Sequence, residues 1–214
     1  MQFEASSLRK DYMKGSLDEK TVLADPFGQF RTWLDAAIEA QLIEANAMAV
    51  ASVGIDGIPS ARTVLLKELS AEGFVFGTNF ESLKGQQITG NPNVALLFYW
   101  PALERQVRVT GSCERTTSDE SDNLFYKRPV EARVSAVASP QSNVIPGRAW
   151  LQEKTDQLWK SLPEGEGPSR PESWGGYRVR PTMFEFWQGR QNRMHDRIRY
   201  RLDDSGWIIE RLAP

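Results

Sequence analysis

Asn93–Trp100 (NVALLFYW) and Arg105–Glu114 (RQVRVTGSCE), which Pro101 separates, predict two neighbouring strands and decide the fold class. The first run is almost entirely apolar. In the second, polar and apolar residues alternate from Gln106 to Thr110, and successive side chains of a strand point to opposite faces. One face of this strand is therefore apolar and the other polar, which is typical of an antiparallel sheet with one buried side.

Short hydrophobic runs between turn residues predict further strands on both sides of this pair. They cover Ala47–Val53, Arg62–Leu69, Gly73–Thr78, Tyr177–Trp187, His195–Leu202 and Trp207–Leu212. Three- and four-residue spacing of apolar side chains and capping residues predict helices over 26–44, 81–89, 118–127 and 150–162. We therefore expect a mainly β (α+β) fold, an antiparallel closed or split β-barrel with peripheral helices.

Composition excludes several classes of protein. The 214 residues are 40% hydrophobic, enough for a sizeable core, and the net charge of -2 argues against a generally basic nucleic-acid binder. Cys113 is the single cysteine and His195 the single histidine, so one chain cannot build a Cys/His metal site.

Without a signal-like segment or an 18-residue apolar run, we expect a cytoplasmic protein that does not bind membranes. The polar residues 1–24 predict a mobile arm before a single domain over 25–214.

Arginine is concentrated near the C-terminus. Residues 177–214 contain eight arginines, no lysine and five acidic residues. Guanidinium groups suit bidentate recognition of phosphate or carboxylate, although a solvated strand surface explains the same pattern. In a regular strand Arg193, His195 and Arg197 would point to one face and form a cationic site. The alternative for His195 is a structural bond to Asp196 or to a carbonyl.

A second candidate site lies in Arg62–Lys67 (RTVLLK). Its two cations are five residues apart, so in a regular strand they would face opposite sides. One ligand could contact both only if the strand bends at its end or the ligand wraps around it. A buried strand with charged ends is the simpler interpretation of the pattern alone. A third candidate is Gln106, which could direct its side-chain amide at the edge of a heteroaromatic ligand. The sequence contains no hydrolase, metalloprotease, P-loop or dinucleotide-binding motif.

The chain closely resembles the pyridoxine/pyridoxamine 5'-phosphate oxidase family, FMN-dependent oxidases that make pyridoxal 5'-phosphate. The matching strings are Arg62–Lys67, Thr78-Asn79, Asn91-Pro92, Leu103–Val107, Arg128-Pro129, Gln141-Ser142, Glu185–Gly189, Arg193–Arg197 and Arg211–Pro214. The resemblance runs from Leu8 to Pro214. It implies a split β-barrel of the FMN-binding type and a homodimer with two FMN molecules at the subunit interface.

The resemblance also implies a role for each matching residue. Contacts with the FMN phosphate and its surroundings would come from Arg62, Lys67, Lys84 and Ser142. The flavin would be lined by Val64, Leu65, Thr78, Gln106 and Gln141, and reached from the partner subunit by Trp187 and Arg197. The substrate phosphate would meet Lys67 and Arg128, with Arg193 and His195 over the pyridine ring. Arg9 and Tyr12 match a segment that can close over the site.

The implied reaction oxidises pyridoxine or pyridoxamine 5'-phosphate. A hydride leaves C4' for N5 of FMN, and O2 reoxidises the flavin and yields hydrogen peroxide. Because the cofactor carries the electron chemistry, Arg193 and His195 are needed only to orient the substrate and stabilise charge. The absence of a catalytic acid–base motif is consistent with this reaction.

Four positions depart from the family pattern. Leu83 replaces an arginine that contacts the FMN phosphate, and Gly77 replaces an aromatic residue. Leu124 and Ala132 stand where the family has the tyrosine and serine that bind the substrate phosphate. These departures keep open a related flavin oxidase for another aromatic, of the phenazine type, and a non-catalytic module that binds FMN or pyridoxal phosphate. Lys67 is retained and argues against the phenazine-type oxidase, because a phosphate-binding lysine has little use on an unphosphorylated ring. A nucleic-acid-binding barrel is a further alternative, and the net negative charge of residues 1–176 argues against it.

Overall fold

Nine strands form one sheet in residues 12–214, the part of the chain that the computed structural model describes. They are β1 (Ala47–Val53), β2 (Pro59–Leu65), β3 (Glu68–Ser70), β4 (Gly73–Asn79), β5 (Asn93–Trp100), β6 (Arg105–Arg115), β7 (Trp174–Gln188), β8 (Asp196–Asp203) and β9 (Gly206–Arg211). The strand order is β2-β1-β5-β6-β7-β4-β3, with β8 paired to β7 and β9 to β8. The pairs β3/β4, β4/β7, β7/β8 and β8/β9 are antiparallel.

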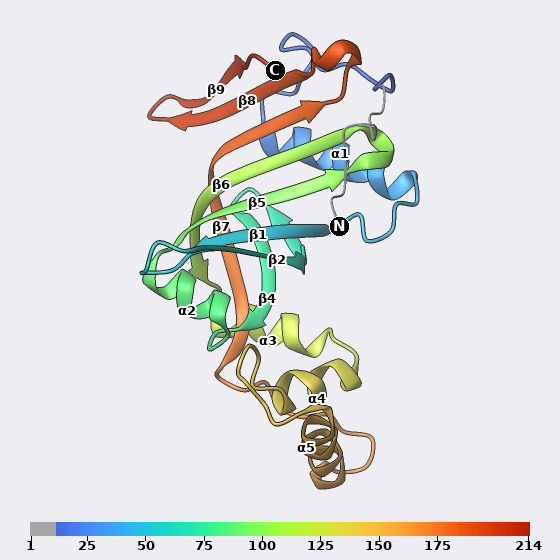
Figure 1. The fold of residues 1–214 in the computed structure, drawn as a ribbon, viewed down its shortest axis with the longest axis vertical. Coiled ribbons are helices and arrows are strands. Elements are labelled where there is room, and N and C mark those ends of the chain that lie inside the picture. The colour runs from blue at the N-terminus through green and yellow to red at the C-terminus, as the bar shows by residue number, and fades with distance from the viewer. Residues whose placement is uncertain (1–11) are drawn as a thin grey trace, which may run out of the picture. The chain divides into compact units, whose positions relative to one another are not determined.

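Five α-helices and two short 3-10 turns accompany the sheet in this part of the chain (Figure 1). They are α1 (Pro26–Glu39), α2 (Leu83–Gly90), α3 (Ser118–Tyr126), α4 (Val130–Ala138), α5 (Arg148–Ser161), η1 (Pro101–Leu103) and η2 (Gln191–Arg193). The predicted helices are all present, whereas sequence analysis assigned no helix to α4. That helix follows Pro129 and buries only Val134, so its apolar periodicity is weak. No helix among residues 12–214 is long and apolar enough to cross a membrane.

The described residues divide into two compact units. The first unit comprises residues 12–48, 96–110 and 182–214, and the second comprises 49–95 and 111–181. Strand β7 belongs to both, because its first half pairs with β4 in the second unit and its last six residues pair with β8 in the first. Each unit has its own core.

Aromatic side chains fill the core of the first unit. Phe30 and Trp33 of α1 pack edge-on against Phe98 and Phe186, with ring centroids 4.7 and 5.3 Å apart. Helix α1 begins as predicted, with the Asp25 side chain accepting from the N–H groups of Phe27 and Gly28. It ends at Glu39 rather than near residue 44, because the chain turns through left-handed residues at 41 and 44. The predicted C-terminal boundary is therefore wrong.

The core of the second unit joins β4 and β7 to α3. Val75, Leu124, Phe125 and Trp174 are buried together there. Helix α3 starts with a capping box, in which Thr117 caps the Glu120 amide and the Glu120 carboxylate accepts from the Thr117 amide. This core positions β4 beside the larger cavity of the candidate site and Leu124 of α3 beside a smaller one.

Candidate functional site

A cavity of about 890 Å³ opens in the second unit and collects the predicted residues of that unit. They are Arg62, Val64, Leu65, Lys67, Thr78, Lys84, Arg128, Gln141 and Ser142. The volume lies within the range of sites that hold drug-sized ligands and cofactors. Gly77 and Leu83, two of the four departures from the family pattern, also line this cavity.

The chain bends between β2 and β3, and this bend brings Arg62 and Lys67 to the same cavity. Strand β2 ends at Leu65, Leu66 is buried, and β3 begins at Glu68. The Lys67 N–H donates to the Val75 carbonyl at 2.8 Å. The single strand predicted over 62–69 is therefore wrong. The bend that sequence analysis required for a shared ligand is present.

Arg62 is held by neutral partners only. Its guanidinium donates to the Val50 carbonyl at 3.2 Å, to Ser52 Oγ at 2.6 Å and to Gln87 Oε1 at 3.2 Å, as well as to Ser60. Burial lowers the pKa of Arg62. Within residues 12–214 it forms no ion pair with a carboxylate. The group is therefore oriented but not neutralised, as an anion-binding arginine requires.

Lys84 is a second buried cation without a carboxylate partner among the described residues. Only 7% of the residue is exposed, and Nζ donates to Thr78 Oγ1 at 2.9 Å and to Ser82 Oγ and Gln141 Oε1, both at 3.3 Å. Burial, and then repulsion from Arg62, lower the pKa of Lys84 to about 8. An anion in the cavity would relieve both effects.

Three residues that were not predicted from the sequence orient Arg62: Ser52, Ser60 and Gln87. Gln87 Oε1 accepts from Ser52 Oγ at 2.8 Å and from Ser60 Oγ at 2.7 Å. Ser52 continues the buried alternation of Met48 and Val50 along β1. Ser52 is thus a polar residue at a position where the alternation of the strand predicts a buried, apolar one. This signal could have indicated Ser52, since buried hydroxyl groups need hydrogen-bond partners.

Arg128 borders a second cavity of about 410 Å³ in the same unit. Its guanidinium donates to the Ala132 carbonyl at 3.1 Å and lies 5.1 Å from the Trp174 ring centroid. Its buried Nε atom has no hydrogen-bond partner among residues 12–214. Lys67 also lines this cavity, and so do Leu124 and Ala132. The cavity wall beside Lys67 and Arg128 is therefore apolar at Leu124 and Ala132, the other two positions that depart from the family pattern.

In the first unit, His195 lies against two other predicted residues. Its ring centroid is 4.7 Å from that of Trp187 and 5.6 Å from that of Tyr12. The Arg190 N–H donates to Nδ1 of His195 at 3.1 Å, so the neutral imidazole carries its proton on Nε2. Burial, and then the charge of Arg193, lower the pKa of His195. At neutral pH the side chain is a neutral donor.

The regular strand expected through Arg193, His195 and Arg197 is wrong. Residues 191–193 form η2, in which Asn192 and Arg193 are left-handed with φ values of 53° and 61°, and β8 begins only at Asp196. Arg197 faces Glu185, with Nε and Nη2 within 2.9 Å of Oε1. Alternation therefore does not bring these three side chains to one face.

Most of the C-terminal arginines are paired with carboxylates. The paired residues are Arg178, Arg180, Arg190, Arg197, Arg199, Arg201 and Arg211. Among the described residues, Arg193 alone of the eight has no such partner. This pairing supports the structural explanation for most of the cluster and leaves Arg193 available for a ligand.

Two predicted residues remain. Gln106 lies in β6 within the first unit and is half-buried. Arg9 lies outside the described residues.

Comparison with known proteins gives consistent matches. Residues 34–161 match the family model described as pyridoxamine 5'-phosphate oxidase, and residues 174–214 match the pyridoxine 5'-phosphate oxidase C-terminal dimerisation region. The chain is 50% identical over 212 residues to the pyridoxine/pyridoxamine 5'-phosphate oxidase of Cupriavidus pinatubonensis, covering 99% of both chains.

Two solved structures resemble the chain over most of its length. PhzG from Burkholderia lata, in complex with tetrahydrophenazine-1-carboxylic acid, has a TM-score of 0.87 and 29% identity, covering 94% of this chain and 100% of that one. A pyridoxamine 5'-phosphate oxidase-related FMN-binding protein from Nostoc punctiforme has a TM-score of 0.68 and 19% identity, with coverages of 86% and 97%. The likeness confirms the predicted fold class, an antiparallel split β-barrel with peripheral helices.

Proposed function

Because the chain belongs to the pyridoxine/pyridoxamine 5'-phosphate oxidase family, we propose that it oxidises pyridoxine or pyridoxamine 5'-phosphate with O2, using FMN. The products are pyridoxal 5'-phosphate and hydrogen peroxide. The observation that carries the proposal is the cavity of the second unit, where Arg62 and Lys84 are oriented by neutral partners only. A phosphate ester is the kind of ligand that neutralises such a pair.

The cavity fits FMN by its donors as well as by its volume. Arg62 and Lys84 would hold the phosphate, together with Lys67 and Ser142. Thr78 and Gln141, which are hydrogen-bonded to each other at 3.1 Å, would contact the flavin, with Val64 and Leu65 as apolar lining. When bound, the flavin supplies a two-electron acceptor for the hydride from C4' and returns the electrons to O2.

The substrate phosphate would bind to Lys67 and Arg128. Both line the smaller cavity, and the unpartnered Nε of Arg128 is a donor that an anion would satisfy. Holding the phosphate fixes the pyridine relative to the flavin, and such orientation accounts for part of the rate.

Arg193 and His195 would contact the pyridine ring. The neutral His195 would donate through Nε2, and Arg193 would stabilise negative charge on the ring. Trp187, Arg197 and Gln106 would complete the flavin site, and Arg9 and Tyr12 would close over the substrate. Since residues 174–214 match a dimerisation region, we propose a homodimer in which Trp187 and Arg197 of the partner subunit reach the FMN.

A flavin oxidase for a different aromatic substrate is the second candidate. The apolar wall formed by Leu124 and Ala132 favours it, because neither side chain can donate a hydrogen bond to a phosphate. The likeness to PhzG agrees with this alternative. The two cations beside that wall, Lys67 and Arg128, favour the phosphorylated substrate.

Peroxide formation by the purified, flavin-loaded protein tests the proposal. We expect release of FMN on denaturation, and peroxide with pyridoxine or pyridoxamine 5'-phosphate in excess of that with unphosphorylated pyridoxine. Turnover of a dihydrophenazine or tetrahydrophenazine carboxylate without turnover of either phosphorylated substrate would establish the second candidate. Absence of bound flavin would refute both.

A further inference from the structure

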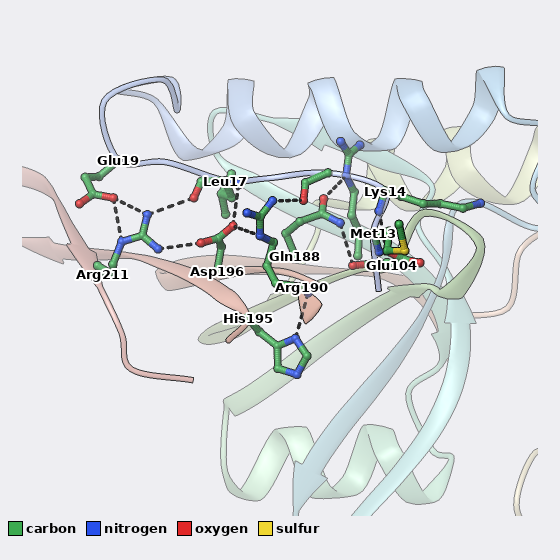
Figure 2. Close-up of polar contacts among 12 residues, drawn as sticks. Met13, Lys14, Leu17, Glu19, Glu104, Gln188, Arg190, His195, Asp196 and Arg211 are labelled. Atoms are coloured by element: carbon green, nitrogen blue, oxygen red, sulfur yellow. Dashed lines mark hydrogen bonds and ion pairs between the residues drawn. The ribbon is translucent and has the colours of Figure 1, made fainter. Parts of the chain in front are cut away.

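Residues 12–19, which we call the N-terminal strap, are fastened to the first unit by groups far away in the sequence (Figure 2). At one end, the N–H groups of Met13 and Lys14 donate to Glu104 Oε2 at 2.8 and 2.9 Å. At the other end, the Leu17 N–H donates to Asp196 Oδ2 at 3.1 Å, and Arg211 binds Glu19 at 2.6 Å. Lys14 Nζ also donates to the Ala102 carbonyl at 2.8 Å, and between the two ends Arg190 donates to the Gly15 carbonyl at 2.9 Å. Of these groups, Glu104 is the one that binds the main-chain N–H groups next to Tyr12.

Glu104 makes the attachment beside Tyr12. Only 6% of the residue is exposed, and it forms no ion pair with any side chain of residues 12–214. Its carboxylate accepts main-chain N–H groups and therefore recognises the strap whatever side chains stand at 13 and 14. Its backbone is left-handed, with a φ of 56°, a conformation that a non-glycine residue keeps only when its surroundings impose it.

The main chain of Glu104 holds the surface on which Tyr12 lies. Its carbonyl accepts from the Gly189 N–H at 2.8 Å and from Gln188 Nε2 at 3.2 Å. A Cβ atom on Gly189 would lie 2.7 Å from Cγ of Tyr12, so the tyrosine packs directly on the glycine backbone. Glu104 therefore contacts the strap through its side chain and the seat of Tyr12 through its carbonyl.

Tyr12 in turn covers His195. Its ring meets those of Trp187 and His195 edge-on, at 5.6 Å in both cases. The Arg190 N–H donates to the imidazole, and the charge of Arg193 also acts on it. The Asp196 carboxylate is directed at Leu17, Arg190 and Arg211 instead.

We infer that Glu104 is a positioning residue, which seats Tyr12 on Gly189, Trp187 and His195 by holding the strap and the glycine at once. Its link to turnover rests on the proposed function, in which Tyr12 and His195 contact the substrate. Its effect on the imidazole does not depend on that function. Removing the Glu104 carboxylate should release Tyr12 and expose His195 to water.

The single histidine allows a direct test by NMR titration of the imidazole in the full chain, without substrate. Burial contributes most to the lowered pKa of His195, so Tyr12→Ala should raise it toward the ordinary value of 6.5. Glu104→Ala should raise it in the same direction, and Glu104→Gln, which retains an acceptor oxygen, should restore most of the wild-type value. Glu210→Gln is the matched control, because the Glu210 carboxylate lies in the same unit but pairs with Arg199 and Arg201 instead of the strap.

The double variant decides the route of the effect. If Glu104 acts through Tyr12, Glu104→Ala adds nothing to the pKa change already caused by Tyr12→Ala. A further rise in the double variant, or an unchanged pKa in Glu104→Ala, would overturn the inference.

Should Glu104→Ala fail to fold, Gly189→Ala provides the test, since its methyl group displaces Tyr12 while Glu104 stays. An unchanged pKa there also overturns it. Failure of the peroxide assay would reject the proposed function and leave this titration unaffected.

Discussion

Lys84 Nζ donates a hydrogen bond of 2.9 Å to Thr78 Oγ1, although the ammonium group is buried and has no carboxylate partner in the described chain. The β4 strand supplies the threonine and the first turn of α2 supplies the lysine. Ser82, the N-cap of that helix, accepts a second hydrogen bond from Nζ at 3.3 Å. A buried cation held by neutral oxygens is destabilised until an anion arrives, so ligand binding and protonation of Lys84 are coupled.

This coupling predicts that FMN affinity falls as the pH rises through about 8, the pKa of Lys84 without ligand. Below that pH the lysine is charged and attracts the phosphate, and above it the attraction is lost. Between pH 7 and 9 the affinity should fall by up to about tenfold, since about one lysine in ten stays charged one unit above its pKa. Lys84→Arg should remove the pH dependence over this range. Flavin titration by fluorescence quenching measures both, and an identical slope in the two proteins would contradict the assignment.

The same pKa predicts how the ligand-free protein responds to pH. The folded-state pKa of about 8 lies below the ordinary 10.5, so the unfolded chain binds the proton more tightly. The free energy of unfolding should therefore rise as the pH increases from about 8 to 10.5, relative to Lys84→Met. Urea denaturation at several pH values gives this difference. A difference that stays constant across this interval would show that Lys84 is not buried as a cation.

Arg62→Ala should weaken FMN binding by about tenfold or more, because a charge-assisted hydrogen bond contributes roughly 1.5–3 kcal/mol. Arg180→Ala is the control, since Arg180 lies in the same unit and pairs with Glu114 at 2.7 Å. Flavin retention after dialysis compares the two. Equal retention would mean that Arg62 serves only to order Ser52, Ser60 and Gln87.

Arg193→Ala should lower kcat/KM by at least about tenfold, the effect of losing roughly 1.4 kcal/mol of transition-state stabilisation. Its melting temperature should change little, because Arg193 is exposed and makes no ion pair within residues 12–214. Arg199→Ala, which breaks the 2.7 Å pair with Glu210, is the control and should retain activity. Wild-type activity together with a lowered melting temperature in Arg193→Ala would assign the residue a structural role.

The double variant Leu124→Tyr, Ala132→Ser should lower KM for pyridoxine 5'-phosphate by about a hundredfold or more, and either single variant by about tenfold or more. Each new hydroxyl would donate to the substrate phosphate beside Lys67 and Arg128, at roughly 1.5–3 kcal/mol per charged hydrogen bond. A remote phosphate is held equally in ground and transition states, so kcat should hardly change. An unchanged or higher KM would indicate that this cavity accommodates a different substrate.

Local sequence was enough to predict most elements of the fold. The predicted run Asn93–Trp100 coincides with β5, and Arg105–Glu114 coincides with β6 to within one residue. Period-two alternation depends only on the geometry of the strand itself and is readable without knowing its neighbours. The start of α1 was predicted for a similar reason, since Asp25 and Pro26 act on their own first turn.

Residue types, spacing and family resemblance together identified the candidate site, but its assembly depends on contacts between distant residues. Lys67 joins Arg62 because its amide binds Val75, and Arg197 turns to Glu185 across the β7/β8 pair. Glu104 reaches Met13 over 91 positions of sequence. The amino-acid sequence by itself determined where most strands and helices form and which side chains can bind anions. The tertiary structure alone decided which arginines are neutralised and where the chain bends, because both depend on partners that local periodicity does not encode.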